Sequence, residues 1–101
     1  MTAKDKNYKV KQKEFYEKLE KQLENVHSWP TTYLFKFIIP TSLEKLAEIE
    51  RVFDDTKPLI STRDSSKGKY TGVTVKVTMK NPEDVIKRYK GVSKIEGIVS
   101  L

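Results

Sequence analysis

The chain has 101 residues, of which 20 are Lys or Arg, 14 are Asp or Glu, one is His and none is Cys. This length supports one domain with one modest core, and it excludes a multidomain enzyme. Without cysteine there is no disulfide, thiol catalyst or cysteine metal site, and a single histidine excludes a paired-histidine site. We therefore expect no metal and no cofactor. No apolar run has the roughly 18 residues that span a membrane, so we expect a soluble, cytoplasmic domain.

The positive charge is concentrated in one part of the chain. The formal net charge is +6, and the segment 63–90 alone has eight basic and three acidic residues, a net of +5. A basic face of this size can attract a nucleic acid or another acidic partner. The alternative interpretation is a lysine-rich solvated surface that keeps a small domain soluble.

Residues 1–28 are expected to form a helical extension that precedes a single domain at 29–101. An apolar stripe with helical spacing supports this expectation: Phe15, Leu19, Leu23 and Val26. The stripe is too short and too rich in glutamine for a coiled coil, so we expect the helix to pack on the domain. It should end before Trp29-Pro30, because the residue before a proline favours extended geometry.

From Thr32 the apolar residues alternate, which predicts a strand that Pro40 ends. Its inward side chains are expected to be Tyr33, Phe35, Phe37 and Ile39. Thr41 followed by Glu44 then matches a capping box at the start of a helix over roughly 42–54. The apolar stripe of that helix is predicted to be Leu43, Leu46, Ala47, Ile49 and Phe53.

The second half of the chain predicts two strands, a helix and a last short strand. The strands are 59–64 and 70–79, joined by a hairpin loop at 65–69 that contains Gly68. The helix begins after Asn81 as its N-cap, with Pro82 in its first turn, and 97–101 forms the last strand. The domain therefore has the order β-α-β-β-α-β. This order predicts an α+β ferredoxin-like sandwich, with two helices on one face of a four-stranded antiparallel sheet and an extra N-terminal helix.

Catalytic chemistry finds little support in the residues, and we expect no enzyme and no catalytic residue. A serine nucleophile would depend on His27, which lies at the end of the leading helix, where a capping or surface role suffices. The acidic pairs at 54–55 and 83–84 have polar neighbours and are expected to lie in solvent. The four glycines stand singly, so there is no phosphate-binding loop.

RNA binding through the sheet is the main rival interpretation, because ferredoxin-like sheets include the RNA-recognition motif, which stacks bases on aromatic side chains. The positions that such stacking needs are filled here by Lys69, Thr71 and Thr74. We therefore do not expect a nucleic-acid partner.

Three surfaces are the candidate binding sites, and the leading helix is the last of them. The first is the hairpin, whose small hydroxyls, amides and lysines could hold an anion: Ser65, Ser66, Lys67, Gly68, Lys69 and Tyr70. The same residues also suit an ordinary solvated turn in which Gly68 supplies a positive φ. The second is the polar face of the sheet: Lys36, Thr74, Lys76 and Thr78.

Three segments together resemble the YbeD-like family of small bacterial proteins of unknown function. They are the run from Trp29 to Lys36, the Ser-Ser-Lys-Gly-Lys-Tyr run at 65–70 and the ending from Lys94 to Leu101. The resemblance implies a ferredoxin-like domain similar to ACT regulatory domains, a regulatory link to lipoate metabolism and no known catalytic residue. The chain departs from the family in its longer N-terminal helix. It also departs from amino-acid-binding ACT domains, because the turn Pro40-Thr41-Ser42 lacks their glycine.

These observations favour a non-enzymatic regulatory or protein-interaction module. The alternative is an ACT-like small-molecule sensor. The partner protein is not identified by the sequence. Leu34 and Ile38 leave some apolar area on the outer face of the sheet, through which a homodimer could form, and no membrane contact is expected.

Overall fold

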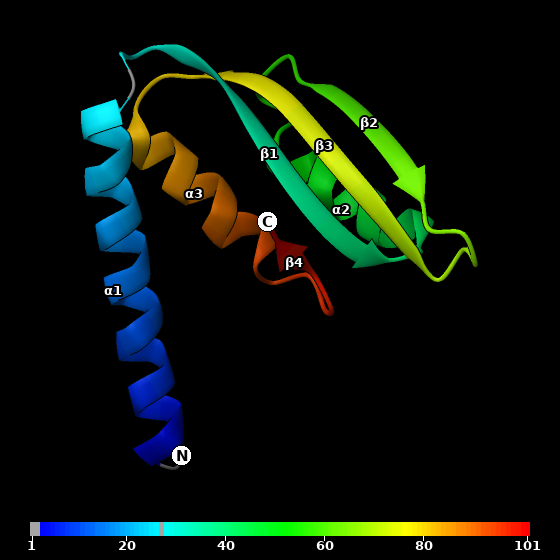
Figure 1. The fold of residues 1–101 in the computed structure, drawn as a ribbon, viewed down its shortest axis with the longest axis horizontal. Coiled ribbons are helices and arrows are strands. Elements are labelled where there is room, and N and C mark those ends of the chain that lie inside the picture. The colour runs from blue at the N-terminus through cyan, green and yellow to red at the C-terminus, as the bar shows by residue number, and fades with distance from the viewer. Residues whose placement is uncertain (1–2, 27) are drawn as a thin grey trace.

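A computed structural model describes residues 3–26 and 28–101 of the chain, so the predicted role of His27 lies outside the described residues. Seven elements follow one another: α1 (Ala3–Val26), β1 (Thr31–Pro40), α2 (Leu43–Val52), β2 (Leu59–Asp64), β3 (Tyr70–Met79), α3 (Pro82–Val92) and β4 (Val99–Ser100). The strands form one antiparallel sheet in the order β2-β3-β1-β4, with α2 and α3 on the same face (Figure 1). The α+β class and the four-stranded antiparallel sheet expected from the sequence are confirmed.

The two central strands, β1 and β3, alternate between a buried and an exposed face, as the sequence pattern predicts. Phe35, Phe37 and Ile39 of β1 are buried, and the residues between them face the other side. In β3 the buried set runs from Thr71 through Val73 and Val75 to Met79. Because strand side chains point alternately to opposite faces, this pattern puts every second residue into the core.

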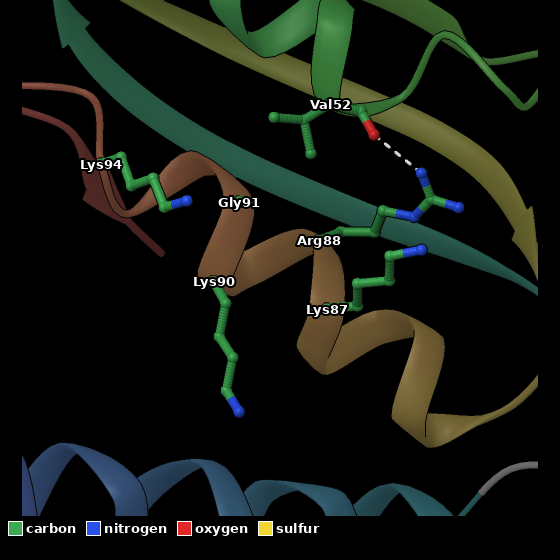
Figure 2. A pocket seen from close by; sticks show the side chains of 6 residues that line it. All are labelled: Val52, Lys87, Arg88, Lys90, Gly91 and Lys94. Carbon is green, nitrogen blue, oxygen red and sulfur yellow. Dashed lines mark hydrogen bonds between the residues drawn. The ribbon is translucent and has the colours of Figure 1, made fainter.

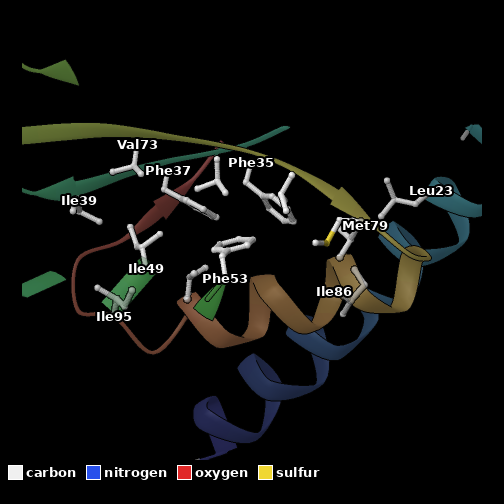
Figure 3. Close-up of a cluster of buried hydrophobic side chains, with 14 residues drawn as sticks. Leu23, Phe35, Phe37, Ile39, Ile49, Phe53, Val73, Met79, Ile86 and Ile95 are labelled. Carbon is white, nitrogen blue, oxygen red and sulfur yellow. The ribbon is translucent and has the colours of Figure 1, made fainter. Parts of the chain in front are cut away.

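Buried hydrophobic side chains, among them an aromatic cluster, fill the core between the sheet and the helices (Figure 3). The ring of Phe35 lies 4.9 Å from that of Phe53, which follows α2, and 5.1 Å from that of Tyr89 in α3. The rings meet edge to face, the arrangement that aromatic pairs favour. Phe35 and Phe53 are fully buried, so this cluster ties both helices to the sheet.

α1 packs against α3, as expected for a helix that docks on the domain, but only Leu19 and Leu23 of the predicted stripe face inward. Leu23 joins the core, and Tyr16 and Leu19 pack against it. Phe15 and Val26, two members of the predicted stripe, are 61% and 74% exposed. The hydrogen bond from Trp29 Nε1 to the Leu23 carbonyl, 3.3 Å, holds the C-terminal end of the helix.

The predicted N-cap of α2 is wrong by one residue. Ser42 caps the helix, since its hydroxyl accepts a hydrogen bond from the Lys45 amide at 3.2 Å. The Thr41 hydroxyl instead lies 2.9 Å from that of Thr71 in β3, which removes it from the helix start. The helix also ends at Val52 rather than near 54, and Leu43, predicted to face the core, is 88% exposed.

α3 begins as predicted, with the side-chain oxygen of Asn81 accepting from the Asp84 amide at 2.8 Å. Gly91 lies inside this helix, where an added Cβ would stand 3.0 Å from Cγ1 of Val52. The missing side chain thus lets α2 and α3 approach closely. β4 is shorter than the predicted 97–101, because Gly97 adopts a φ of +80° and belongs to the preceding turn.

Candidate functional site

No helix of the described residues covers one face of the sheet, and we call this face the outer face (Figure 1). The strand register arranges its side chains in rows that cross β1, β3 and β2. One row contains Lys36, Thr74 and Ser61, and the rows on either side of it are Leu34, Lys76, Leu59 and Ile38, Gly72, Arg63. Three of the predicted polar residues, Lys36, Thr74 and Lys76, are therefore brought together, and Thr78 continues the same face beyond Lys76.

The outer face is positively charged. Lys36, Arg63 and Lys76 lie in three successive rows and on three different strands. The outward positions of the described strands hold no Asp or Glu. Because no acidic side chain at these strand positions neutralises them, the three cations together create a positive potential over the sheet.

A shallow basin of about 410 Å³ lies on this face above Gly72. Lys36 and Arg63 stand on either side of it, and Leu101 borders it beyond β1. A Cβ at Gly72 would make only an ordinary contact, 3.6 Å from the Arg63 carbonyl, so the glycine is not required by crowding. Its lack of a side chain keeps the floor low, which leaves room for a carboxylate between the two cations.

The hairpin at one end of the outer face is largely committed to its own turn. The Ser65 amide donates to the Tyr70 carbonyl at 2.8 Å, and the Gly68 amide donates to the Ser65 carbonyl at 2.9 Å. The Ser65 hydroxyl accepts from the Tyr70 amide at 3.2 Å, and Gly68 has a φ of +69°. Ser66, Lys67 and Lys69 are exposed. The turn therefore uses three of the amides that an anion site would need, and binding by this hairpin stays a prediction.

Sequence reasoning missed Arg63 and Ser61 as members of this surface. Both lie in β2, whose weak alternation gave no sign of which side chains face outward. The register with β3 settles this point, because Arg63 pairs with Gly72 and Ser61 pairs with Thr74. Arg63 was visible only as the first residue of the basic segment.

A second polar cluster lies between α2 and α3 and is centred on Arg88 (Figure 2). The Arg88 guanidinium is buried, donates to the Val52 carbonyl at 2.7 Å and pairs with both oxygens of Asp55. It also lies 3.1 Å from Asp84, whose side chain is only 13% exposed. The expectation that both acidic pairs lie in solvent is thus wrong for Asp84, because its i,i+4 spacing to Arg88 draws it against the helix.

The contacts of this cluster and of the core shift two pKa values. The hydrogen bond from Arg88 lowers the pKa of Asp55 below its usual 3.8. Burial raises the pKa of Tyr89, and the Tyr33 hydroxyl 3.2 Å away adds to that rise. Each of these side chains joins two elements of the fold.

Beside Arg88 lies a concavity of about 350 Å³ that Gly91 and Val52 border (Figure 2). Lys87, Lys90 and Lys94 surround it. Lys90 points away toward α1, with its ammonium 5.5 Å from the centre of the Tyr16 ring. Arg88 is already paired, so this concavity is a less complete anion site than the basin on the outer face.

Comparison with known proteins gives one match. The model of a protein family of unknown function, DUF493, matches residues 24–101, in agreement with the resemblance found in the sequence. No curated protein and no solved structure gives a match. The matched region begins inside α1, and the division of the chain at residue 28 stays a prediction. No helix in the described part of the chain is long and apolar enough to cross a membrane.

Proposed function

Because this chain belongs to the DUF493 family, whose function is unknown, we propose a role from its surfaces: it is a non-enzymatic protein-interaction module whose outer face binds an acidic partner protein. The observation that carries the proposal is the placement of Lys36, Arg63 and Lys76 in successive rows on a sheet face whose outward strand positions hold no Asp or Glu. Complementary charge steers such partners together and rejects basic ones.

The apolar residues among these cations support a protein partner. Leu34 is 49% exposed and Leu59 is 72% exposed, and they flank Lys76 in one row of the outer face. Val99 and Leu101 add exposed apolar surface beside β1. Protein interfaces combine buried apolar area with charged groups at the rim, whereas a free anion would gain nothing from these leucines. The occupant is therefore a protein surface that presents carboxylates next to apolar side chains.

We further infer a ferredoxin-like arrangement for the domain. The order of elements after α1 is β-α-β-β-α-β, and β3 lies between β1 and β2, which supports this assignment. The non-enzymatic role is supported by the use of the perturbed groups: Asp55 pairs with Arg88, and the Tyr89 hydroxyl lies against that of Tyr33. A regulatory role linked to lipoate metabolism rests on the family resemblance alone.

The basin favours one alternative function, an ACT-like sensor of a small carboxylate. Its volume of about 410 Å³ and its two flanking cations suit a molecule of amino-acid or lipoate size. Such a ligand would raise the melting temperature of the chain, because it binds only the folded state.

The test uses a labelled peptide of alternating Glu and Leu residues as the probe of the outer face. We expect the peptide to bind the intact chain by fluorescence anisotropy and to bind less tightly as the salt concentration rises. Three single variants reverse one charge each: Lys36→Glu, Arg63→Glu and Lys76→Glu. Each should weaken peptide binding about fivefold or more. Lys94→Glu is the matched control, because it makes the same charge change after α3, away from the sheet's outer face.

Three outcomes would contradict the proposal. Equal losses for Lys94→Glu and the three face variants would mean that the peptide responds only to net charge. Tighter binding of single-stranded oligouridine than of the peptide would favour RNA as the partner. A rise in melting temperature with lipoate or an amino acid, together with no peptide binding, would favour the sensor.

A further inference from the structure

The sheet has a second unoccupied feature, the edge of β1 on the side of β4. β1 pairs with β3 along its whole length, from Thr31 to Pro40, but it pairs with β4 only at Phe37 and Ile38. One more bond, from the Leu101 amide to the Lys36 carbonyl at 2.9 Å, extends this contact. Over residues 31–35, no described strand pairs with this edge of β1.

The pairing pattern identifies the backbone groups at this edge. In an antiparallel pair, the amide and carbonyl of one residue point to the same side, and successive residues alternate. The backbone carbonyl of Lys36 points toward β4, where it accepts from the Leu101 amide. The Thr41 amide instead donates to the Lys69 carbonyl on the β3 side. By the same alternation, the amides and carbonyls of Thr32 and Leu34 point to the open edge. Such unpaired edges are templates for another strand.

A slot lies directly beside this edge. Its volume is about 280 Å³, and its walls are Phe15, Tyr16 and Leu19 of α1, Tyr33 of β1 and Tyr89 of α3, with the end of the chain at Ser100 and Leu101. The slot thus occupies the line along which β4 would continue. α1 forms its far wall, and aromatic and aliphatic side chains supply most of its lining.

From the open edge and the slot together we propose a peptide-binding site: an extended segment of a partner protein adds to β1 as a strand in line with β4 and places an apolar side chain in the slot. In this mode of recognition, main-chain hydrogen bonds give affinity, and pockets for alternate side chains give specificity. The site does not include the cations of the outer face, so this proposal is tested independently of the proposed function.

The two parts of the site select for the same kind of occupant. The backbone amides and carbonyls of Thr32 and Leu34 need partner amides and carbonyls that are free and in extended geometry. A small molecule or a helix does not offer these. A strand laid on this edge points every second side chain to the inner side of the sheet, where the slot lies. The slot therefore selects a large apolar residue at alternate positions, and about five peptide residues cover the edge at roughly 3.3 Å each.

The experiment selects ligands from a phage-displayed library of random short peptides against the intact chain. We expect enriched peptides with an apolar residue at alternate positions. Binding should shift and protect the amides of Thr32 and Leu34 in NMR spectra. Each selected peptide is then made in two N-methylated forms, one for each alternate set of amides. Strand addition predicts that one form loses binding at least about tenfold and that the other retains it, because only one set faces β1.

Two variants of the chain test the edge and the slot separately. Thr32→Pro removes an edge donor that does not face β3, and Thr32→Ala is its control, because it keeps the amide. Phe15→Ala removes a wall of the slot, with Leu43→Ala in α2 as the matched loss of an exposed apolar side chain. We expect Thr32→Pro and Phe15→Ala each to weaken binding about tenfold, while both controls bind as the intact chain does.

Melting curves establish that each variant is folded before its binding is compared. The proposal is overturned if the library yields no ligand, if both N-methylated forms bind equally, or if the shifted amides lie on the outer face around Arg63. The last result would still support the proposed function, so the two failures are distinguishable.

Discussion

Arg88 joins α3 to the end of α2 through several polar contacts. Its buried guanidinium satisfies the Val52 carbonyl and pairs with Asp55 and with the largely buried Asp84. Removing Arg88 leaves the charge of the largely buried Asp84 without compensation, whereas Asp55 is mostly exposed. We expect Arg88→Met to lower the free energy of unfolding by about 3 kcal/mol in urea denaturation. Lys87→Met, at the exposed neighbouring position, is the control, and an equal loss there would contradict this account.

The ion pair between Arg88 and Asp55 predicts how the stability of the chain changes in acid. Arg88 holds the pKa of Asp55 below its usual 3.8, so the unfolded chain takes up this proton before the folded chain does. The stabilisation by Asp55 is therefore complete above the unfolded value and is lost as the pH falls through the lower folded value. Urea denaturation between neutral pH and pH 2 should show a shallower acid loss for Asp55→Asn than for the intact chain. An unchanged slope would show that other carboxylates dominate.

At the scale of the elements, the distance between α2 and α3 depends on Gly91. An added Cβ would lie 3.0 Å from Cγ1 and 3.3 Å from Cγ2 of Val52. Alanine gains about 1 kcal/mol over glycine within a helix. We expect Gly91→Ala alone not to stabilise the chain by this amount, because Val52 must move. In the Val52→Ala background, the same change should stabilise the chain by about that amount. A double-mutant cycle measures the difference, and additive effects would show that the two residues do not conflict.

The strands were easier to predict than the faces of the helices. Alternation in β1 and β3 is strong enough to identify the buried residues, and the Asn81 cap and the hairpin are local features that need no tertiary information. α1 shows why a helical stripe is weaker evidence. Phe15 and Tyr16 are adjacent aromatics, and only the position of α3 decides that Tyr16 faces it. The Ser42 cap was missed because Thr41 also fits the motif until β3 engages its hydroxyl.

The candidate site was predictable in part for the same reason. Lys36, Thr74 and Lys76 lie on strands with clear alternation, so their common face follows from the sequence. Arg63 needed the register of β2, and the slot beside β1 needed the positions of three elements that are distant in the chain. Arg88 could not be recognised as buried, because a charged residue on a helix is ordinarily exposed and its partner Asp55 is distant in sequence.

For the molecule as a whole, the positive charge of the outer face predicts how salt affects self-association. A homodimer through the sheet would bring Lys36, Arg63 and Lys76 of two copies toward one another. We therefore expect any such dimer to strengthen as salt screens this repulsion, between about 50 mM and about 500 mM NaCl. Analytical ultracentrifugation measures this directly. Dissociation on adding salt would contradict it, and binding of the acidic probe should show the opposite salt dependence.

The one-sided sheet has a consequence for how this chain can change over generations. In β1 and β3, neighbouring residues serve separate tasks, since one set builds the core and the set between them meets the solvent. Substitutions at the outward positions can therefore change the surface of the sheet while its core is left intact. A change in length has the opposite effect, because deleting one residue within β1 would exchange the two sets and turn Lys36 toward Phe53. The outward residues of these strands can therefore vary by substitution, whereas the lengths of the two central strands are constrained.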